Sequence, residues 1–169
     1  CARERKQLPL AGREVGSAFA DRCVVALGQA INEAIDLHGA PHVARYLETN
    51  GEDGYHWRNG TTVLILFTTG RRSGEPRTNA LIFRPWGDAY LVIASKGGAD
   101  SPPAWFLNLS DDPEVEVQVK DRRIPVRARV ATPNEKPEMW RTMVEAWPDY
   151  DDYQASTDRE IPVVVLEPR

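Results

Sequence analysis

The chain has 169 residues, of which 27% are charged and 41% hydrophobic, and its formal net charge is −4. A chain of this length can bury one sizeable core, and its acidic balance disfavours nucleic-acid binding through bulk charge. The two cysteines, Cys1 and Cys23, exclude a disulfide framework and favour a reducing, cytoplasmic setting. No HExxH, GxSxG or paired-cysteine motif occurs, so neither a metal site nor a hydrolase triad is expected.

The N-terminal part is predicted to be a loose arm followed by helices. Residues 1–16 are polar and basic, which indicates a flexible basic arm. Over residues 17–37, apolar side chains recur every four positions, as on one stripe of an amphipathic helix. Pro41 then suits the first turn of a short second helix. We therefore predict N-terminal helices over residues 17–47.

From residue 61 the pattern changes to short apolar strands separated by turn signals. The first three are too close together for parallel crossovers, so they should form antiparallel hairpins. Because unpaired edges are costly, six such strands are expected to close into a small antiparallel barrel over 61–169, within a single domain over 17–169. The predicted strands cover residues 61–68, 77–84, 89–95, 114–119, 123–130 and 161–168.

Helices are expected between the later strands and outside the barrel. The prolines of "DSPPAWFLNL" should open a short helix. "TPNE" is a capping box that places Pro133 at the first position of a helix ending near Ala146. The aromatic and acidic segment that follows, "WPDYDDYQASTD", is expected to form one helical turn.

The turn "GRRSGEPRTN" between the first two strands concentrates positive charge in an acidic chain. Arg71, Arg72 and Arg77 supply planar guanidinium groups that suit phosphate and carboxylate, and Ser73 adds a hydroxyl donor. The two glycines of the turn allow backbone N–H groups to approach an anion. A solvated hairpin is the alternative, but we favour an anion site. The strand-turn-strand context excludes a Walker loop.

Two further segments have residues suited to the same ligand. "IASKGG" ends a strand in Ser95 and Lys96 before two glycines, which suits a second phosphate or ring-oxygen contact. In "PAWFLNL", Trp105 and Phe106 beside Asn108 could stack on a planar heterocycle and bond to it. A polar strand end and ordinary core packing are the respective alternatives.

Three aromatic residues near the C-terminus recur at a spacing of three. Trp147, Tyr150 and Tyr153 would share one face of a helical turn. They either anchor the segment to the barrel or form the apolar wall of a substrate pocket, where a tyrosine hydroxyl can donate a hydrogen bond or a proton.

These motifs occur together and in one order: "TTGRRSGEPRTN", "ASKGG", "PAWFLNL", "DPEVEVQV" and "YDDYQASTDREIPVVVLEP". In this the chain resembles the deazaflavin (coenzyme F420)-dependent nitroreductase family of actinobacterial reductases, from about Thr61 to the C-terminus. The resemblance implies a split β-barrel like that of flavin-binding pyridoxamine-phosphate oxidases. It also implies a cofactor with a planar ring, a phosphodiester and an oligoglutamate tail.

The resemblance further implies roles for individual residues. Ser95, Tyr150 and Tyr153 are, beside water, the candidates for a catalytic donor. Trp147, Tyr150 and Tyr153 are the candidates for the substrate side, with Trp147 standing where the family is expected to have tyrosine. The implied cofactor-binding residues are Arg71, Arg72, Ser73, Arg77, Thr78, Asn79, Ala80, Leu81, Ile82, Ile93, Ala94, Ser95, Lys96, Ala104, Trp105, Phe106, Leu107 and Asn108.

The function implied by the resemblance is hydride transfer from reduced F420 to an electron-poor acceptor, such as a quinone, an activated enone or a nitro-aromatic. An FMN- or haem-binding split barrel, a non-catalytic deazaflavin carrier and an RNA-binding barrel remain alternatives. The expected partner is a small-molecule acceptor and no nucleic acid. A monomer or weak homodimer is expected in the cytoplasm, with peripheral contact at the inner face of the membrane if the acceptor is a lipid quinone.

Overall fold

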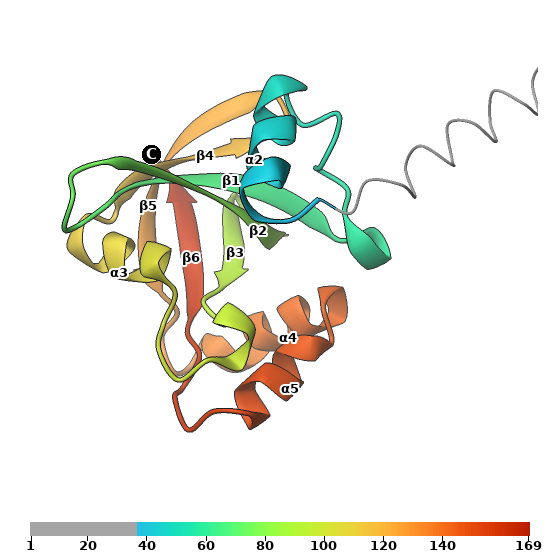
Figure 1. The fold of residues 1–169 in the computed structure, drawn as a ribbon. Coiled ribbons are helices and arrows are strands. Elements are labelled where there is room, and N and C mark those ends of the chain that lie inside the picture. The colour runs from blue at the N-terminus through green and yellow to red at the C-terminus, as the bar shows by residue number, and fades with distance from the viewer. Residues whose placement is uncertain (1–36) are drawn as a thin grey trace, which may run out of the picture. The chain divides into compact units, whose positions relative to one another are not determined.

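A closed antiparallel barrel of six strands forms the centre of the computed structural model, which describes residues 37–169 (Figure 1). Around the barrel the strands follow the order β1-β2-β3-β6-β5-β4, so the predicted six-stranded antiparallel barrel is confirmed. Each predicted strand exists, and the observed ends differ by two residues or fewer. The strands are β1 (Thr62–Thr69), β2 (Pro76–Trp86), β3 (Ala89–Ile93), β4 (Glu114–Val119), β5 (Arg122–Val130) and β6 (Val163–Pro168).

Four helices are described outside the barrel, along with two short 3-10 turns. In Figure 1, α2 lies beside β1 and β2, whereas α4 and α5 lie together near the ends of β3 and β6. The predicted arm over 1–16 and the predicted helix over 17–37 lie outside the described residues, apart from Leu37. The elements are α2 (Gly39–Glu48), η1 (Arg58–Gly60), η2 (Lys96–Gly98), α3 (Ala104–Asp111), α4 (Lys136–Ala146) and α5 (Asp149–Ala155).

Alternate residues of the strands point to opposite faces, one packed in the barrel interior and the other packed against the outer helices. In β1, Leu64 and Leu66 belong to the barrel interior, whereas Val63 and Ile65 pack outward with the residues of α2. Strand β6 divides in the same way between the interior and the residues of α4 and α5. This explains why both strands are continuously apolar in the sequence, since they are buried on both faces.

The barrel splits between β2 and β3. Strand β2 pairs with β1 over eight positions but with β3 only at Arg84, Pro85 and Trp86. The earlier residues of β2 therefore have no β3 partner across the ring. The resulting opening is where the candidate functional site lies.

The capping box before α4 forms as predicted, although the assigned helix starts later. The Thr132 backbone N–H donates to Glu135 Oε2 at 2.9 Å, and the Glu135 backbone N–H donates to Thr132 Oγ1 at 3.4 Å. Residues 133–135 are assigned as a turn, so the predicted helical start at Pro133 is three residues early.

Candidate functional site

The arginine-rich turn that joins β1 to β2 is closed by its own backbone. Gly70 N–H donates to the Glu75 carbonyl and Gly74 N–H to the Gly70 carbonyl, both at 2.8 Å. A Cβ on Gly70 would lie 2.7 Å from Ser73 Oγ, and Gly74 has a φ of +69°, so both positions favour glycine. The closed turn leaves Arg71 and Arg72 exposed at its tip.

Asn108 ties this turn to the helix beneath it. Its side-chain Oδ1 accepts from the Arg71 backbone N–H at 3.2 Å, and its Nδ2 donates to Thr68 Oγ1 at 3.2 Å. The side chain is buried, and Figure 1 shows α3 next to the turn. Asn108, predicted as a cofactor residue, thus also fixes the position of the arginines.

A cavity of about 520 Å³ lies between the turn, the β2 residues that follow it, Lys96 and α3. Four of its side chains are cationic, and no carboxylate of the described residues 37–169 lines it. Among residues 37–169, none of these four cations is ion-paired with a carboxylate. The cavity therefore has a positive potential suited to an anion. Its lining residues are Gly70, Arg71, Arg72, Ser73, Arg77, Thr78, Asn79, Lys96, Pro103, Ala104, Trp105 and Asn108.

The loop after β3 has an unusual backbone. Lys96, Gly97 and Gly98 have φ values of +50°, +62° and +79°, and a positive φ is costly for a residue with a side chain such as lysine. A Cβ on Gly98 would lie 2.8 Å from the Tyr153 carbonyl oxygen, so the loop packs directly on α5. Lys96 Nζ bonds to Ser101 Oγ at 2.9 Å.

Arg159, which the sequence analysis did not single out, holds this loop in place. Its guanidinium donates to the carbonyl oxygens of Ala94, Ser95 and Ala99 at 3.0 to 3.3 Å. These bonds connect the segment after α5 to the end of β3 and to the loop that carries Lys96. Arg159 therefore positions site residues without lining either site cavity.

A second cavity, of about 300 Å³, adjoins the cationic one. Lys96, Pro103 and Trp105 line both, so the two lie side by side. The second cavity is mostly aromatic and apolar, as a planar ring requires. It is lined by Trp57, Ala80, Leu81, Ile82, Ile93, Ser95, Lys96, Gly97, Pro103, Trp105, Trp147, Tyr150 and Tyr153.

Tyr150 and Ser95 are the most buried polar side chains of this aromatic cavity. Burial raises the pKa of Tyr150 far above its usual value of 10, with a smaller contribution from Tyr153. The Tyr150 hydroxyl therefore keeps its proton throughout the physiological pH range and can act as a hydrogen-bond donor. Ser95 is 9% exposed, and its backbone carbonyl is fixed by Arg159.

The two cavities bring together most of the residues predicted for the site, and three predicted residues lie elsewhere. Ala94 is fully buried in the barrel core, Leu107 lines neither cavity, and Phe106 lines a separate small cavity beside Val130. Trp57 is a lining residue that sequence reasoning missed. Its only signal is an aromatic residue within a polar loop, "YHWRNG", and nothing in the sequence links that loop to residue 147.

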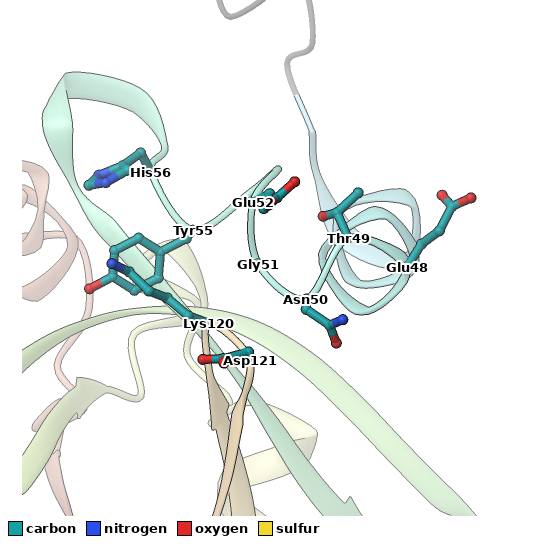
Figure 2. Close-up of a pocket in the computed structure, with 9 residues that line it drawn as sticks. All are labelled: Glu48, Thr49, Asn50, Gly51, Glu52, Tyr55, His56, Lys120 and Asp121. Atoms are coloured by element: carbon teal, nitrogen blue, oxygen red, sulfur yellow. The ribbon is translucent and has the colours of Figure 1, made fainter.

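A third cavity, of about 820 Å³, shares no residue with these two (Figure 2). Glu48, Glu52 and Asp121 give it an acidic lining, and its one cation, Lys120, lies 4.8 Å from the centre of the Tyr55 ring. Its size alone therefore does not make it a site for an anionic ligand.

Two histidines, His42 in α2 and His38 just before it, have structural roles. His42 is buried and its Nε2 lies 2.8 Å from the Gly54 carbonyl oxygen, while His38 packs edge-on against Trp57. Within residues 37–169, no cluster of three or more histidine, cysteine, aspartate or glutamate side chains is arranged to hold a metal.

The fold and the site together define a class of protein: a split-barrel protein with a cationic cavity beside an aromatic one. A family model described as F420H(2)-dependent quinone reductase matches residues 40–168. The F420H(2)-dependent quinone reductase Rv1261c of Mycobacterium tuberculosis is 40% identical over 131 residues, which cover 76% of this chain and 88% of that protein. The chain belongs to the F420H(2)-dependent quinone reductase family.

Solved structures agree with this assignment. A structure described as an F420-H2 dependent reductase, FDR-A, is 38% identical, with a TM-score of 0.58 over 62% of this chain and 93% of that one. Another, described as a domain-swapped dimer, is 36% identical, with a TM-score of 0.61 over 74% of this chain and 93% of that one. The predicted family, its reductase activity and its F420 cofactor are thus confirmed.

The haem-binding alternative has a counterpart only at the level of the fold. HutZ, described as a haem storage protein from Vibrio cholerae, is 16% identical, with a TM-score of 0.50 over 75% of this chain and 89% of that one. At this identity the likeness shows a shared fold and nothing about the ligand.

Proposed function

We propose that this chain uses reduced coenzyme F420 to reduce a quinone. The observation that carries the proposal is that a cavity lined by unpaired cations adjoins an aromatic cavity, with Lys96, Pro103 and Trp105 lining both. A cofactor that joins a polyanionic tail to a planar ring needs these two environments side by side.

The residues of the cationic cavity fit the anionic part of F420. Arg71, Arg72 and Arg77 would bind the phosphodiester and the glutamate carboxylates, because an arginine fork can make two parallel charge-assisted bonds. Lys96 lies where the two cavities meet, so it would bind the phosphate nearest the ring. The absence of lining carboxylates supports this assignment, since none would repel the tail.

The residues of the aromatic cavity fit the ring and the acceptor. The backbone of β2 at Ala80, Leu81 and Ile82 pairs with β1 but has no β3 partner across the split, so the polar groups that point away from β1 are available to a planar heterocycle. The aromatic side chains on the opposite wall would exclude water and hold an acceptor ring by stacking.

When bound, reduced F420 supplies a hydride, which together with one proton converts a quinone into a hydroquinone, a two-electron reduction. The chain's contribution is to stabilise the negative charge that develops on the quinone oxygen. Tyr150 suits this role because its raised pKa keeps the hydroxyl protonated. Ser95 and Tyr153 line the same cavity and are the other candidate donors. No protein nucleophile is required.

The proposal also covers other acceptors, the oligomeric state and contact with the membrane. An activated enone or a nitro-aromatic meets the same requirement for an electron-poor planar group. We propose a monomer or weak homodimer that touches the membrane surface when the quinone is lipid-soluble. Within residues 37–169, no helix has the length and apolar character needed to cross a bilayer.

The test is a fluorescence titration with oxidised F420, run beside FMN and followed by an assay of quinone reduction by F420H2. We expect micromolar or tighter binding of F420, weaker binding of FMN, and consumption of F420H2 only when a quinone is present. Binding to FMN alone would overturn the cofactor assignment. F420 binding without turnover on any acceptor would instead indicate a carrier.

A further inference from the structure

Trp57 belongs to the aromatic cavity although it lies outside the barrel strands. It precedes η1, in the connection between α2 and β1. Its ring stacks on Trp147, with the ring centres 5.5 Å apart and the planes inclined by 26°. Both indoles line the aromatic cavity and neither lines the cationic one, whereas Trp105 lines both. The Trp57–Trp147 pair therefore lines only the aromatic part of the site.

Several segments fix the position of Trp57. Its backbone N–H donates to the Thr61 carbonyl at 2.9 Å, and its indole N–H donates to the Leu37 carbonyl at 3.0 Å. The His38 ring packs edge-on against the indole, with the ring centres 5.1 Å apart. A side chain held from both ends and packed on two rings acts as a fixed wall rather than a mobile lid.

The position of this wall limits what the cavity can hold. A volume of about 300 Å³ is at the small end for ligand cavities, and the F420 ring would take part of it. The remaining space suits a flat ring and has little room for groups that project from the ring plane. Trp57 is half-buried, so replacing it with a small residue would widen the cavity toward the segment before β1.

We propose that Trp57, stacked on Trp147, determines acceptor specificity by favouring small planar quinones over quinones with bulky ring substituents. This inference rests on the proposed function, because it concerns the acceptor of the same reaction. It gives the connection between α2 and β1 a direct part in substrate selection.

The experiment compares two quinones, menadione and a di-tert-butyl benzoquinone, in wild type, Trp57→Ala and Trp57→Phe. The quantity measured is the ratio of kcat/KM for the two acceptors with F420H2. For Trp57→Ala we expect kcat/KM for menadione to fall about threefold to tenfold, the range of one lost aromatic contact. We expect kcat/KM for the bulky quinone to rise in the same variant. The acceptor ratio of Trp57→Phe should lie between the ratios of wild type and Trp57→Ala. Intrinsic differences in reactivity cancel because the same pair is compared in every variant.

Trp86→Ala is the matched control, since Trp86 is another half-buried tryptophan that lines neither site cavity. A change in the acceptor ratio only in the Trp57 variants supports the inference. An unchanged ratio in a folded Trp57 variant, or an equal change in Trp86→Ala, overturns it. Wild-type protein that binds F420 but reduces neither quinone would instead count against the proposed function. If Trp57→Ala does not fold, the ratio for Trp57→Phe decides the question.

Discussion

Arg71 and Arg77, in and just after the β1–β2 turn, and Arg129 on β5 use the same side chain in opposite ways. On β5, Arg129 bonds to Glu167 at 2.7 Å and to both carboxylate oxygens of Glu135 at 2.9 and 3.0 Å. The guanidinium groups of Arg71 and Arg77, by contrast, have no carboxylate partner among the described residues. The first arrangement satisfies the guanidinium within the protein, whereas the second leaves it available to a ligand.

This difference resolves an apparent conflict in the composition. A chain with a net charge of −4 would not be expected to bind a polyanion. Binding depends on the local field, however, and the carboxylates of this fold neutralise arginines on other faces. What distinguishes the candidate site is therefore unpaired charge in a cavity, and five substitutions can test the roles of these paired and unpaired groups.

The largest effect is expected from removing the unpaired arginines. Arg71→Ala and Arg77→Ala should each weaken F420 binding by about 1.5 to 3 kcal/mol, or roughly 10- to 150-fold in Kd, because each loses a charge-assisted contact. Fluorescence titration measures this. The control is Arg123→Ala, whose guanidinium is paired with Glu116 on β4. An equal loss of F420 affinity in all three variants would show that an arginine's ion pairing does not decide whether it binds the cofactor.

Arg159 represents a third use of arginine, since it bonds to backbone carbonyls rather than to carboxylates. Arg159→Gln should lower the free energy of unfolding by about 1.5 to 3 kcal/mol, as charged hydrogen bonds to Ala94, Ser95 and Ala99 are lost. Urea unfolding measures the change. Arg141→Gln, an exposed arginine on α4, should stay within about 0.5 kcal/mol of wild type. A similar loss in both variants would contradict the positioning role.

A smaller and purely kinetic effect is expected from Tyr150→Phe. The substitution removes the buried hydroxyl and leaves the ring, so F420 affinity should be preserved while kcat falls by about tenfold, the equivalent of one hydrogen bond. Steady-state kinetics with a quinone, beside an F420 titration, measure the two quantities. Unchanged kcat would rule out the Tyr150 hydroxyl as an essential donor and leave Ser95 and Tyr153.

The smallest effect is expected on stability, from removing the carboxylate of Glu135 that pairs with Arg129 of β5. The Arg129 guanidinium, with help from Thr132, lowers the pKa of Glu135 from 4.5 to about 2. A depressed carboxyl pKa contributes stability that is fully present above pH 4.5 and is lost as the pH falls toward 2. Glu135→Gln should therefore be less stable than wild type in urea at pH 7, with a smaller difference near pH 3.

The control for this last prediction is Glu145→Gln on α4, an exposed glutamate for which the described residues provide no ion pair. It should change little at either pH. A Glu135→Gln defect that is the same size at both pH values would mean that the Arg129 pair does not contribute to stability.

Much of the fold was predictable because it depends on local patterns. Strand alternation, the capping box at Thr132 and the prolines before α3 each reflect interactions between residues close in sequence. The arginine turn was also predictable, since Arg71, Arg72 and Ser73 lie within three consecutive positions. The order of the motifs along the chain then indicated the family.

Only the tertiary structure determined which distant residues meet. It brought Trp57 onto Trp147 across ninety positions, and it placed the Arg159 guanidinium on carbonyls more than fifty residues away. Two residues predicted for the site lie elsewhere in the structure: Ala94 is in the barrel core, and Phe106 lines another cavity. Sequence patterns establish which face of an element is apolar. Where the barrel splits, and which loops reach the split, follows from strand pairing across the whole ring.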